Sequence, residues 1–218
     1  MKTLLYIDGF NLYYGALKNT PFKWLNPLSL TQRKFRKNQI IGVKYFTAKV
    51  SGRSGDQSQP QRQELYWRAL RTIPSLEIIC GHFREREIRA RVVDPPPNFI
   101  NVFKTEEKGS DVNLATNLLM DGFRDKYEVA IVISGDSDLI TPIKMIRDEI
   151  GKPVGVVNPQ LVSGPVAKPK HKRRKNAGLK KACSFYHAGI SWNQLSESVF
   201  PDTLTDCVGS FTRPSEWR

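Results

Sequence analysis

Two aspartates separated by a single residue, Asp136 and Asp138, lie in the sequence SGDSD at positions 134–138. Two carboxylates this close repel each other and need a cation or a proton to coexist. Hard divalent cations such as Mg²⁺ take carboxylate oxygens of this kind as ligands. The pattern therefore favours a metal site. The alternative is an aspartate-rich helix cap on a solvated loop.

The elements around these aspartates place them at the end of a strand. Residues 129–133 are apolar, mostly β-branched and without polar alternation, which predicts a strand buried on both faces, as in a parallel sheet. Apolar residues then recur at helical spacing up to Ile150, and Thr141-Pro142 predicts an N-cap followed by proline at the first helical position. Open α/β sheets bind their ligands at such carboxyl ends of strands.

Two further aspartates occupy similar positions. Residues 2–7 predict a strand that ends at Asp8, and Gly9 and Asn11 in the following turn tolerate unusual backbone angles. Asp111 begins a predicted helix, where the helix dipole favours a carboxylate and its oxygens can cap free N–H groups. Capping is the alternative role for Asp111, and it does not exclude metal binding.

The remaining patterns predict the fold. Short apolar strands at 40–50, 76–83, 152–157 and 183–190 alternate with helices, which indicates an α/β protein with a mainly parallel sheet and helices on both faces. Residues 84–104 predict an exposed hairpin extension whose basic face could contact a substrate; a plain solvated hairpin is the alternative. Residues 161–181 are interpreted as a flexible basic loop, and residues 182–218 as a strand and a capped helix that complete the same domain as residues 1–160.

Composition narrows the class of protein and its partners. The 218 residues include 34 basic and 21 acidic side chains, and the net charge of +13 favours a polyanionic partner such as nucleic acid. No run of 18 apolar residues predicts a membrane span, and the N-terminal apolar stretch is too short for a signal peptide. Three widely spaced cysteines favour reduced thiols in a cytoplasmic protein, and their spacing relative to histidine is not that of a zinc finger.

Three short motifs in a fixed order carry a family resemblance: YIDGFN at 6–11, KGSDV at 108–112 and SGDSDL at 134–139. Together they resemble the NYN domain family, the LabA-like members of the PIN-like nuclease superfamily. The resemblance implies a three-layer α/β/α, Rossmann-like domain with an acidic pocket at the carboxyl edge of its sheet. It also implies Mg²⁺- or Mn²⁺-dependent cleavage of RNA. The catalytic, metal-holding set would be Asp8, Asp111, Asp136 and Asp138, with Asn11 as an accompanying polar residue. The basic segment at 168–181 and the hairpin extension are not part of this family pattern.

These expectations combine into a metal-dependent ribonuclease acting on RNA, expected to be single-stranded, with the oligomeric state open between monomer and homodimer. Substrate contacts are expected from Asn11, Lys108, Arg173 and Arg174. The alternative is a non-catalytic RNA-binding or regulatory module on the same fold. A binder of polyanions, however, gains nothing from four aspartates in one pocket. A phosphatase with an aspartyl nucleophile is disfavoured, because the first strand ends in Asp8-Gly9-Phe10 and lacks a second aspartate.

Overall fold

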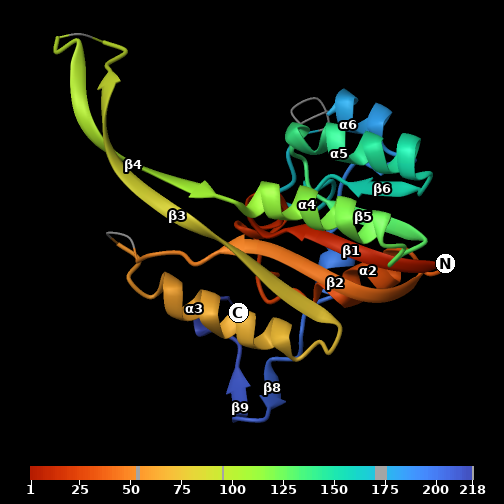
Figure 1. The fold of residues 1–218 in the computed structure, drawn as a ribbon. Helices are drawn as coiled ribbons and strands as arrows, with labels where there is room; N and C mark the ends of the chain where they lie inside the picture. Colours follow the sequence, from red (N-terminus) through yellow and green to blue (C-terminus); the bar gives the residue numbers. More distant parts are fainter. Residues whose placement is uncertain (53–54, 95, 170–175, 218) are drawn as a thin grey trace.

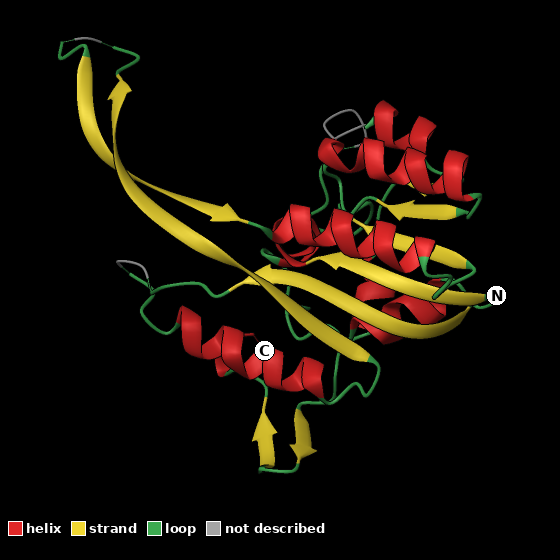
Figure 2. Cartoon of the chain, in the orientation of Figure 1, coloured by secondary structure: helices red, strands yellow, loops and turns green. Residues whose placement is uncertain are grey.

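A seven-stranded sheet forms the centre of the computed structural model, which describes residues 1–52, 55–94, 96–169 and 176–217 (Figures 1 and 2). Its strands follow the order β4-β3-β2-β1-β5-β6-β7, and all neighbours are parallel except β3 and β4. The strands are β1 (Lys2–Asp8), β2 (Gln39–Ala48), β3 (Leu76–Arg91), β4 (Phe99–Lys108), β5 (Val129–Ile133), β6 (Val154–Val157) and β7 (Phe185–His187). The predicted mainly parallel sheet is confirmed.

Helices cover both faces of this sheet, which confirms the three-layer α/β/α architecture (Figure 2). One face is covered by α4 (Ser110–Phe123), α5 (Ile140–Met145) with η3 (Ile146–Ile150), and α6 (Ala177–Ala182). The other face is covered by α1 (Gly9–Leu12) with η1 (Tyr13–Leu17), α2 (Pro27–Lys34), α3 (Gln59–Arg71) and α7 (Trp192–Ser196). Among the described residues, every helix is too short or too polar to cross a lipid bilayer.

Strand β1 shows why two cores form. Successive side chains of a strand point to opposite faces of the sheet. Leu5 and Ile7 therefore pack into the core beneath α1, while Leu4 and Tyr6 pack into the core beneath α4. Strand β5 is buried along its whole length for the same reason, since it lies between β1 and β6 in the middle of the sheet.

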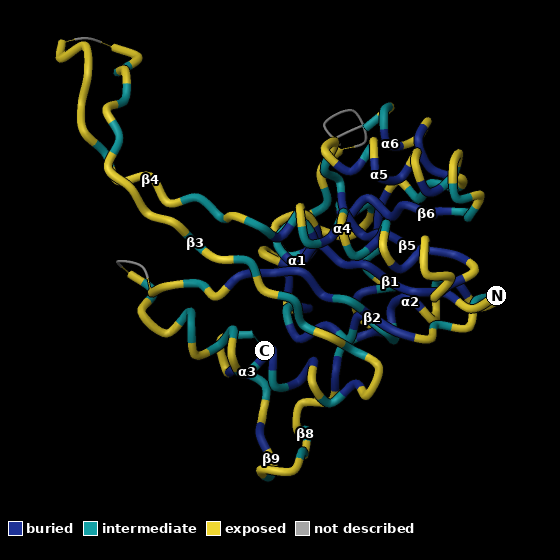
Figure 3. Tube along the Cα trace, viewed as in Figure 1, coloured by how far each residue is buried: buried dark blue, intermediate teal, exposed yellow. Residues whose placement is uncertain are grey.

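The predicted hairpin extension is present and longer than expected. Strand β3 pairs with β2 only over 76–81 and then continues, paired with β4, as a two-stranded arm that projects from the body of the molecule (Figure 1). Most of the arm is exposed (Figure 3). Its arginines do not share one basic face, because side chains alternate along a strand. Arg84 and Arg86 lie on one face, and Arg89 and Arg91 lie on the other.

Two local predictions were wrong. Thr141 is not an N-cap, because Asp136 caps a short 3-10 helix, η2 (Ser137–Leu139), that runs directly into α5 and leaves Pro142 inside the first turns. The flexible loop was predicted over 161–181, but its last residues are helical, because Ala177–Ala182 form α6. The Asn176 side chain caps this helix, and its Leu179 side chain is buried. The capped helix predicted within residues 182–218 is confirmed as α7, which begins with a capping box formed by Ser191 and Gln194.

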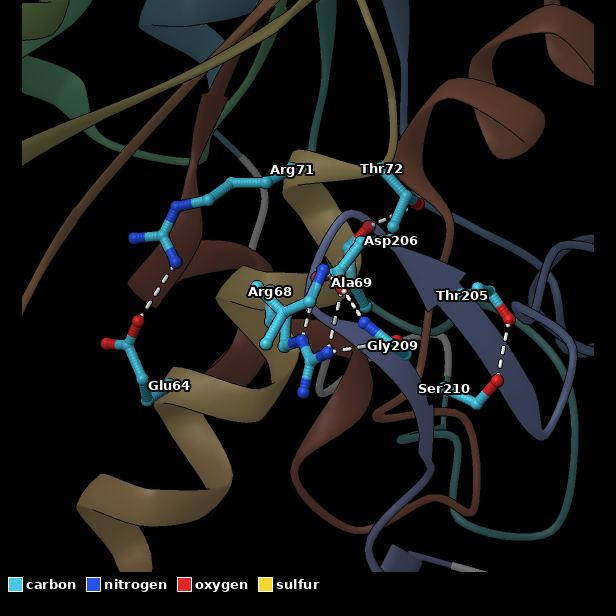
Figure 4. A network of polar contacts seen from close by, with 10 residues as sticks. Glu64, Arg68, Ala69, Arg71, Thr72, Thr205, Asp206, Gly209 and Ser210 are labelled. Carbon is cyan, nitrogen blue, oxygen red and sulfur yellow. Dashed lines mark hydrogen bonds and ion pairs between the residues drawn. The ribbon is translucent and has the colours of Figure 1, made fainter.

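The C-terminal residues form a small hairpin that sequence patterns did not predict. Strands β8 (Thr203–Asp206) and β9 (Gly209–Thr212) pair antiparallel and lie against α3. Arg68 on α3 donates two hydrogen bonds to the Asp206 carboxylate, both at 2.7 Å (Figure 4). The Arg68 guanidinium also lies 4.1 Å from the centre of the Phe211 ring. The last described turn, η5 (Ser215–Trp217), lies beside the same helix, since the Trp217 ring contacts the Tyr66 ring of α3.

Candidate active site

The candidate site lies where β1 and β5 end side by side. From β1, the strands that follow in the chain (β2 and β3) are added on one side of the sheet. From β5, the strands that follow (β6 and β7) are added on the other side, so the direction of strand order reverses between β1 and β5. Ligands of open α/β sheets bind at such switch points, outside the carboxyl ends of the strands. Ile7 is paired with Ile133, which places Asp8 next to Ser134.

Asp8 is fixed by hydrogen bonds on both carboxylate oxygens. The Asn11 backbone N–H donates to Oδ1 (2.9 Å), while the Asn11 side-chain Nδ2 (2.5 Å) and the Ser134 hydroxyl (3.0 Å) donate to Oδ2. Asn11 is itself held, because its Oδ1 accepts from the Gly135 N–H at 3.3 Å. Burial raises the pKa of Asp8, which is only 4% exposed, and the charge of Asp136 adds to this, against the opposing effect of the hydrogen bonds.

Asp136 and Asp138 form the turn after β5. The Asp136 N–H donates to the Ser134 hydroxyl oxygen (3.1 Å), and the Asp136 carboxylate accepts from the Asp138 N–H (3.0 Å). Asp136 is therefore a helix cap, the alternative role considered for this motif, and its second carboxylate oxygen has no hydrogen bond among the described residues. The side chain of Asp138 is exposed at the mouth of the site.

Asp111 approaches the same site from α4. The Ser110 hydroxyl oxygen lies 3.1 Å from the Thr47 carbonyl oxygen, so the start of α4 is next to the end of β2. Burial raises the pKa of Asp111 to about 6, and the negative charges of four other acids contribute in decreasing order: Asp8, Asp136, Glu107 and Asp138. Asp8, Asp136 and Asp138, from two other segments of the chain, thus lie near enough to Asp111 for their charges to raise its pKa.

Glu107 is the acidic residue that sequence reasoning missed. Its Oε1 accepts from both the N–H (3.1 Å) and the hydroxyl (2.7 Å) of Ser110, so it supports the start of α4 beside Asp111. The available signal was its position directly before the KGSDV motif, four residues ahead of Asp111. Its location follows from the antiparallel pairing of β4 with β3, which brings the end of β4 back to the body of the sheet.

The oxygen donors fit a hard divalent cation, but they do not form a complete cage. Among the described residues, no three acidic, histidine or cysteine side chains converge closely enough to enclose a metal ion. Mg²⁺ does not require such a cage, since it usually keeps several waters and binds through one or two carboxylates. Burial, with smaller contributions from neighbouring carboxylates, raises the pKa of Asp8 and of Asp111, and a bound cation would favour their charged forms.

The four residues that were expected to contact substrate differ in their positions and contacts. Asn11 bonds to Asp8, so its observed contact is one that orients the carboxylate. Lys108 lies at the end of β4, with its side chain 54% exposed and its Nζ 3.3 Å from Glu106 Oε2. Arg173 and Arg174 lie outside the described residues.

Two cavities flank the Asp8 turn, and Phe10 and Tyr14 contribute to the walls of both. The larger, of about 610 Å³, is polar in part, with Asn11, Asn158 and Asn176 in its wall. The smaller, of about 390 Å³, is lined by aromatic side chains from several elements. Gly9 lines the smaller cavity and Asn11 and Gly135 line the larger one, whereas none of the four aspartates lines either.

Comparisons with known proteins agree with this architecture. The chain is 31% identical over 246 aligned residues to 6-hydroxy-3-succinoylpyridine 3-monooxygenase HspA of Pseudomonas putida strain S16, in an alignment that covers 100% of this chain and 75% of the relative. A crystal structure of a protein of unknown function from Vibrio parahaemolyticus RIMD 2210633 has the same fold, with a TM-score of 0.51 and 15% identity, over 88% of this chain and 92% of that one. The family model described as NYN domain matches residues 2–186, and the chain belongs to this family.

Proposed function

We propose that this protein is a divalent-metal-dependent ribonuclease that hydrolyses phosphodiester bonds of single-stranded RNA. The observation that supports it best is the gathering of Asp8, Asp111, Asp136 and Asp138 at the switch point of the sheet. This negative site belongs to a protein whose net charge is +13. Such a combination suits a nuclease, since cations attract the phosphates and carboxylates hold a metal.

The contacts of the side chains suggest a different role for each group of residues. Asp111, Asp136 and Asp138, together with Asp8, would hold Mg²⁺ or Mn²⁺, which when bound supplies an acidified water and neutralises charge on the phosphate. Asn11 and Ser134 keep the Asp8 carboxylate oriented through their hydrogen bonds. Glu107 adds a further negative charge beside Asp111.

The basic segment 168–181 would supply phosphate contacts, including those of Arg173 and Arg174. Two of its described residues, Lys168 and Asn176, line the larger cavity together with Asn11. Asn176 also donates to the Gly135 carbonyl oxygen (3.2 Å), next to Asp136. Contacts of this kind give affinity with little sequence preference and a strong dependence on salt.

Cleavage of end-labelled, mixed-sequence single-stranded RNA with Mn²⁺, with Mg²⁺ or with EDTA tests the proposal. The wild type is compared with Asp136→Asn and with the control Asp125→Asn, which removes an exposed carboxylate paired with Lys152 far from the site. Metal-dependent cutting that Asp136→Asn loses and Asp125→Asn keeps is the expected result. Salt-sensitive binding without cutting under any condition would leave the RNA-binding module as the better description.

A second candidate function is the hydroxylation of a pyridine ring. The relative of 31% identity that aligns with the whole of this chain is named as a monooxygenase of 6-hydroxy-3-succinoylpyridine. A monooxygenase places one oxygen atom of O₂ in its substrate and reduces the other to water with two electrons from a reductant. Oxygen uptake that requires both this pyridine and NADH or NADPH would support the second candidate. No uptake, together with metal-dependent RNA cutting, would exclude it.

A further inference from the structure

The smaller cavity beside the Asp8 turn has aromatic rings from four parts of the chain in its walls, together with polar and charged side chains. We call it the aromatic cavity and define it by Tyr13, Tyr45, Tyr66, Trp67 and Trp217. Tyr45 comes from β2, Tyr66 and Trp67 from α3, Tyr13 from η1, and Trp217 from the C-terminal turn. We propose that the aromatic cavity binds a planar aromatic ring that carries an anionic group, and holds that ring beside the turn that follows Asp8.

The rings are held in a fixed arrangement. The centres of the Tyr66 and Trp217 rings are 6.1 Å apart with an interplanar angle of 72°, and those of Tyr45 and Tyr66 are 6.3 Å apart at 77°. The Tyr66 hydroxyl donates to the Leu25 carbonyl oxygen at 2.9 Å, which fixes this side chain in the wall. Preorganised rings of this kind favour flat ligands, since stacking costs the protein little conformational entropy.

The cavity borders the turn that follows Asp8. Gly9, the residue after Asp8, lines the cavity and lies so close to Tyr45 that a Cβ atom at this position would be only 2.7 Å from Tyr45 Cε1. The negative charge of Asp8 also contributes to the raised pKa of Tyr45, after the larger effect of burial. A ring in the aromatic cavity would therefore lie against the turn that follows Asp8.

The size and the charges of the cavity restrict the ligand. A volume of about 390 Å³ lies within the usual range for small-molecule sites, roughly 300–1,000 Å³. Arg62 is already paired with Asp56 (2.5 Å) and Glu216 (3.4 Å) at the rim. Lys23 also lines the cavity, and within the described part of the chain it has no carboxylate within ion-pair distance. Lys23 is thus the cation available for an anionic group on the ring.

The same chemistry occurs in two kinds of ligand. One is a nucleotide, whose base is the ring and whose phosphate is the anion; the other is a free pyridine with a carboxylate substituent. Stacking on aromatic side chains recognises the flat face of either ring. The proposal does not depend on metal-assisted hydrolysis, because binding of the ring uses neither the metal nor the reacting phosphate.

Calorimetric titration in EDTA tests the proposal with defined probes. Uridine 5′-monophosphate and 6-hydroxynicotinate are the two ring-bearing anions, and ribose 5-phosphate and succinate are their ring-free counterparts. Wild type is compared with Trp217→Leu, which removes one ring from the wall, and with Trp192→Leu, which removes another half-buried tryptophan that lines neither cavity. A third variant, Lys23→Gln, removes the cation.

We expect at least one ring-bearing probe to bind while the ring-free anions do not. Trp217→Leu should weaken that binding about tenfold and Lys23→Gln several-fold, whereas Trp192→Leu should change it less than twofold. The probe that binds more tightly identifies the source of the ring. Equal binding of ring-free anions, unchanged binding in a folded Trp217→Leu variant, or no binding of any probe to the wild type would overturn the proposal. A failure of RNA cleavage would not affect this outcome, so the two proposals are tested separately.

Discussion

Ser134 donates a hydrogen bond of 3.0 Å to the carboxylate of Asp8, although the two residues are 126 positions apart in the chain. The same serine oxygen accepts from the Asp136 N–H at 3.1 Å. One fully buried hydroxyl thus connects the first acidic motif of the chain to the third. The relative positions of Asp8 and Asp136 depend on this contact, and its removal is a direct test of the site.

We expect Ser134→Ala to lower the rate of RNA cleavage about tenfold or more with little change in KM. The substitution removes a hydrogen bond to a charged carboxylate, which contributes about 1.5–3 kcal/mol, and it frees Asp8 to move. Single-turnover kinetics measure the effect. Ser198→Ala is a matched control, since Ser198 is also fully buried but its hydroxyl has no hydrogen-bond partner among the described residues. A rate equal to that of the control would show that Ser134 does not position Asp8.

Asp111→Asn should stabilise the metal-free protein. Burial and the charges of neighbouring acids make a carboxylate unfavourable at this position, so removing the charge relieves repulsion within the cluster. We expect the variant to melt a few degrees higher than the wild type in EDTA at neutral pH. Adding Mg²⁺ or Mn²⁺ should raise the melting temperature of the wild type and raise that of the variant less. An unchanged melting temperature of the wild type at millimolar metal would contradict metal binding at this site.

The sequence was sufficient to predict the sheet, its buried strands and the positions of Asp8, Asp111 and Asp136 at element ends, because burial on both faces and strand–helix alternation leave strong local patterns. It was not sufficient to predict that Glu107 lies beside Asp111. The contact of Glu107 with Ser110 depends on how β4 pairs with β3 and brings the chain back to the sheet. The C-terminal hairpin was missed for a similar reason. Its position depends on Arg68 binding Asp206, two residues 138 positions apart, which no local pattern encodes.

A second buried acid, Asp121, should make stability depend on pH. Its carboxylate accepts from the Tyr6 hydroxyl (2.8 Å) and pairs with Lys44 (2.6 Å), and only 3% of the residue is exposed. Burial alone would raise the pKa of Asp121, but the bonds from Lys44 and Tyr6 outweigh it and lower the pKa below its ordinary value. A lowered folded-state pKa gives stability that is present above the unfolded-state pKa of about 4 and is lost as the pH falls through the folded-state value.

Asp121→Asn should therefore lower the free energy of unfolding by about 3–5 kcal/mol at pH 7, because it leaves Lys44 without its buried partner. The difference from wild type should shrink as the pH is lowered below about 4. Urea denaturation at several pH values measures both effects. Asp148→Asn is the control, since Asp148 pairs with Arg147 at the exposed surface, where such pairs contribute about 0–1 kcal/mol. A pH-independent loss of stability in Asp121→Asn would contradict this assignment.

The arm provides the last test, because its two faces differ in their relation to the site. Phe83 lies on the same face as Arg89 and Arg91, and its ring contacts Phe10, two residues after Asp8, with ring centres 5.7 Å apart. Arg89 is further held by its guanidinium, which lies 4.7 Å from the centre of the Phe99 ring. This face is directed toward the acidic site at the base of the arm, and we expect it to contact RNA.

Replacing Arg89 and Arg91 by alanine should weaken RNA binding and reduce its dependence on salt, by about 0.7 in the logarithmic slope for each phosphate that the variant no longer neutralises. Replacing Arg84 and Arg86, on the opposite face, removes the same charge and serves as the control. Both double variants should keep the wild-type melting temperature, because these side chains belong to neither hydrophobic core. Binding measured at several salt concentrations distinguishes the faces. An equal weakening in both variants would mean that the arm attracts RNA through its net charge and that its orientation toward Asp8 does not matter.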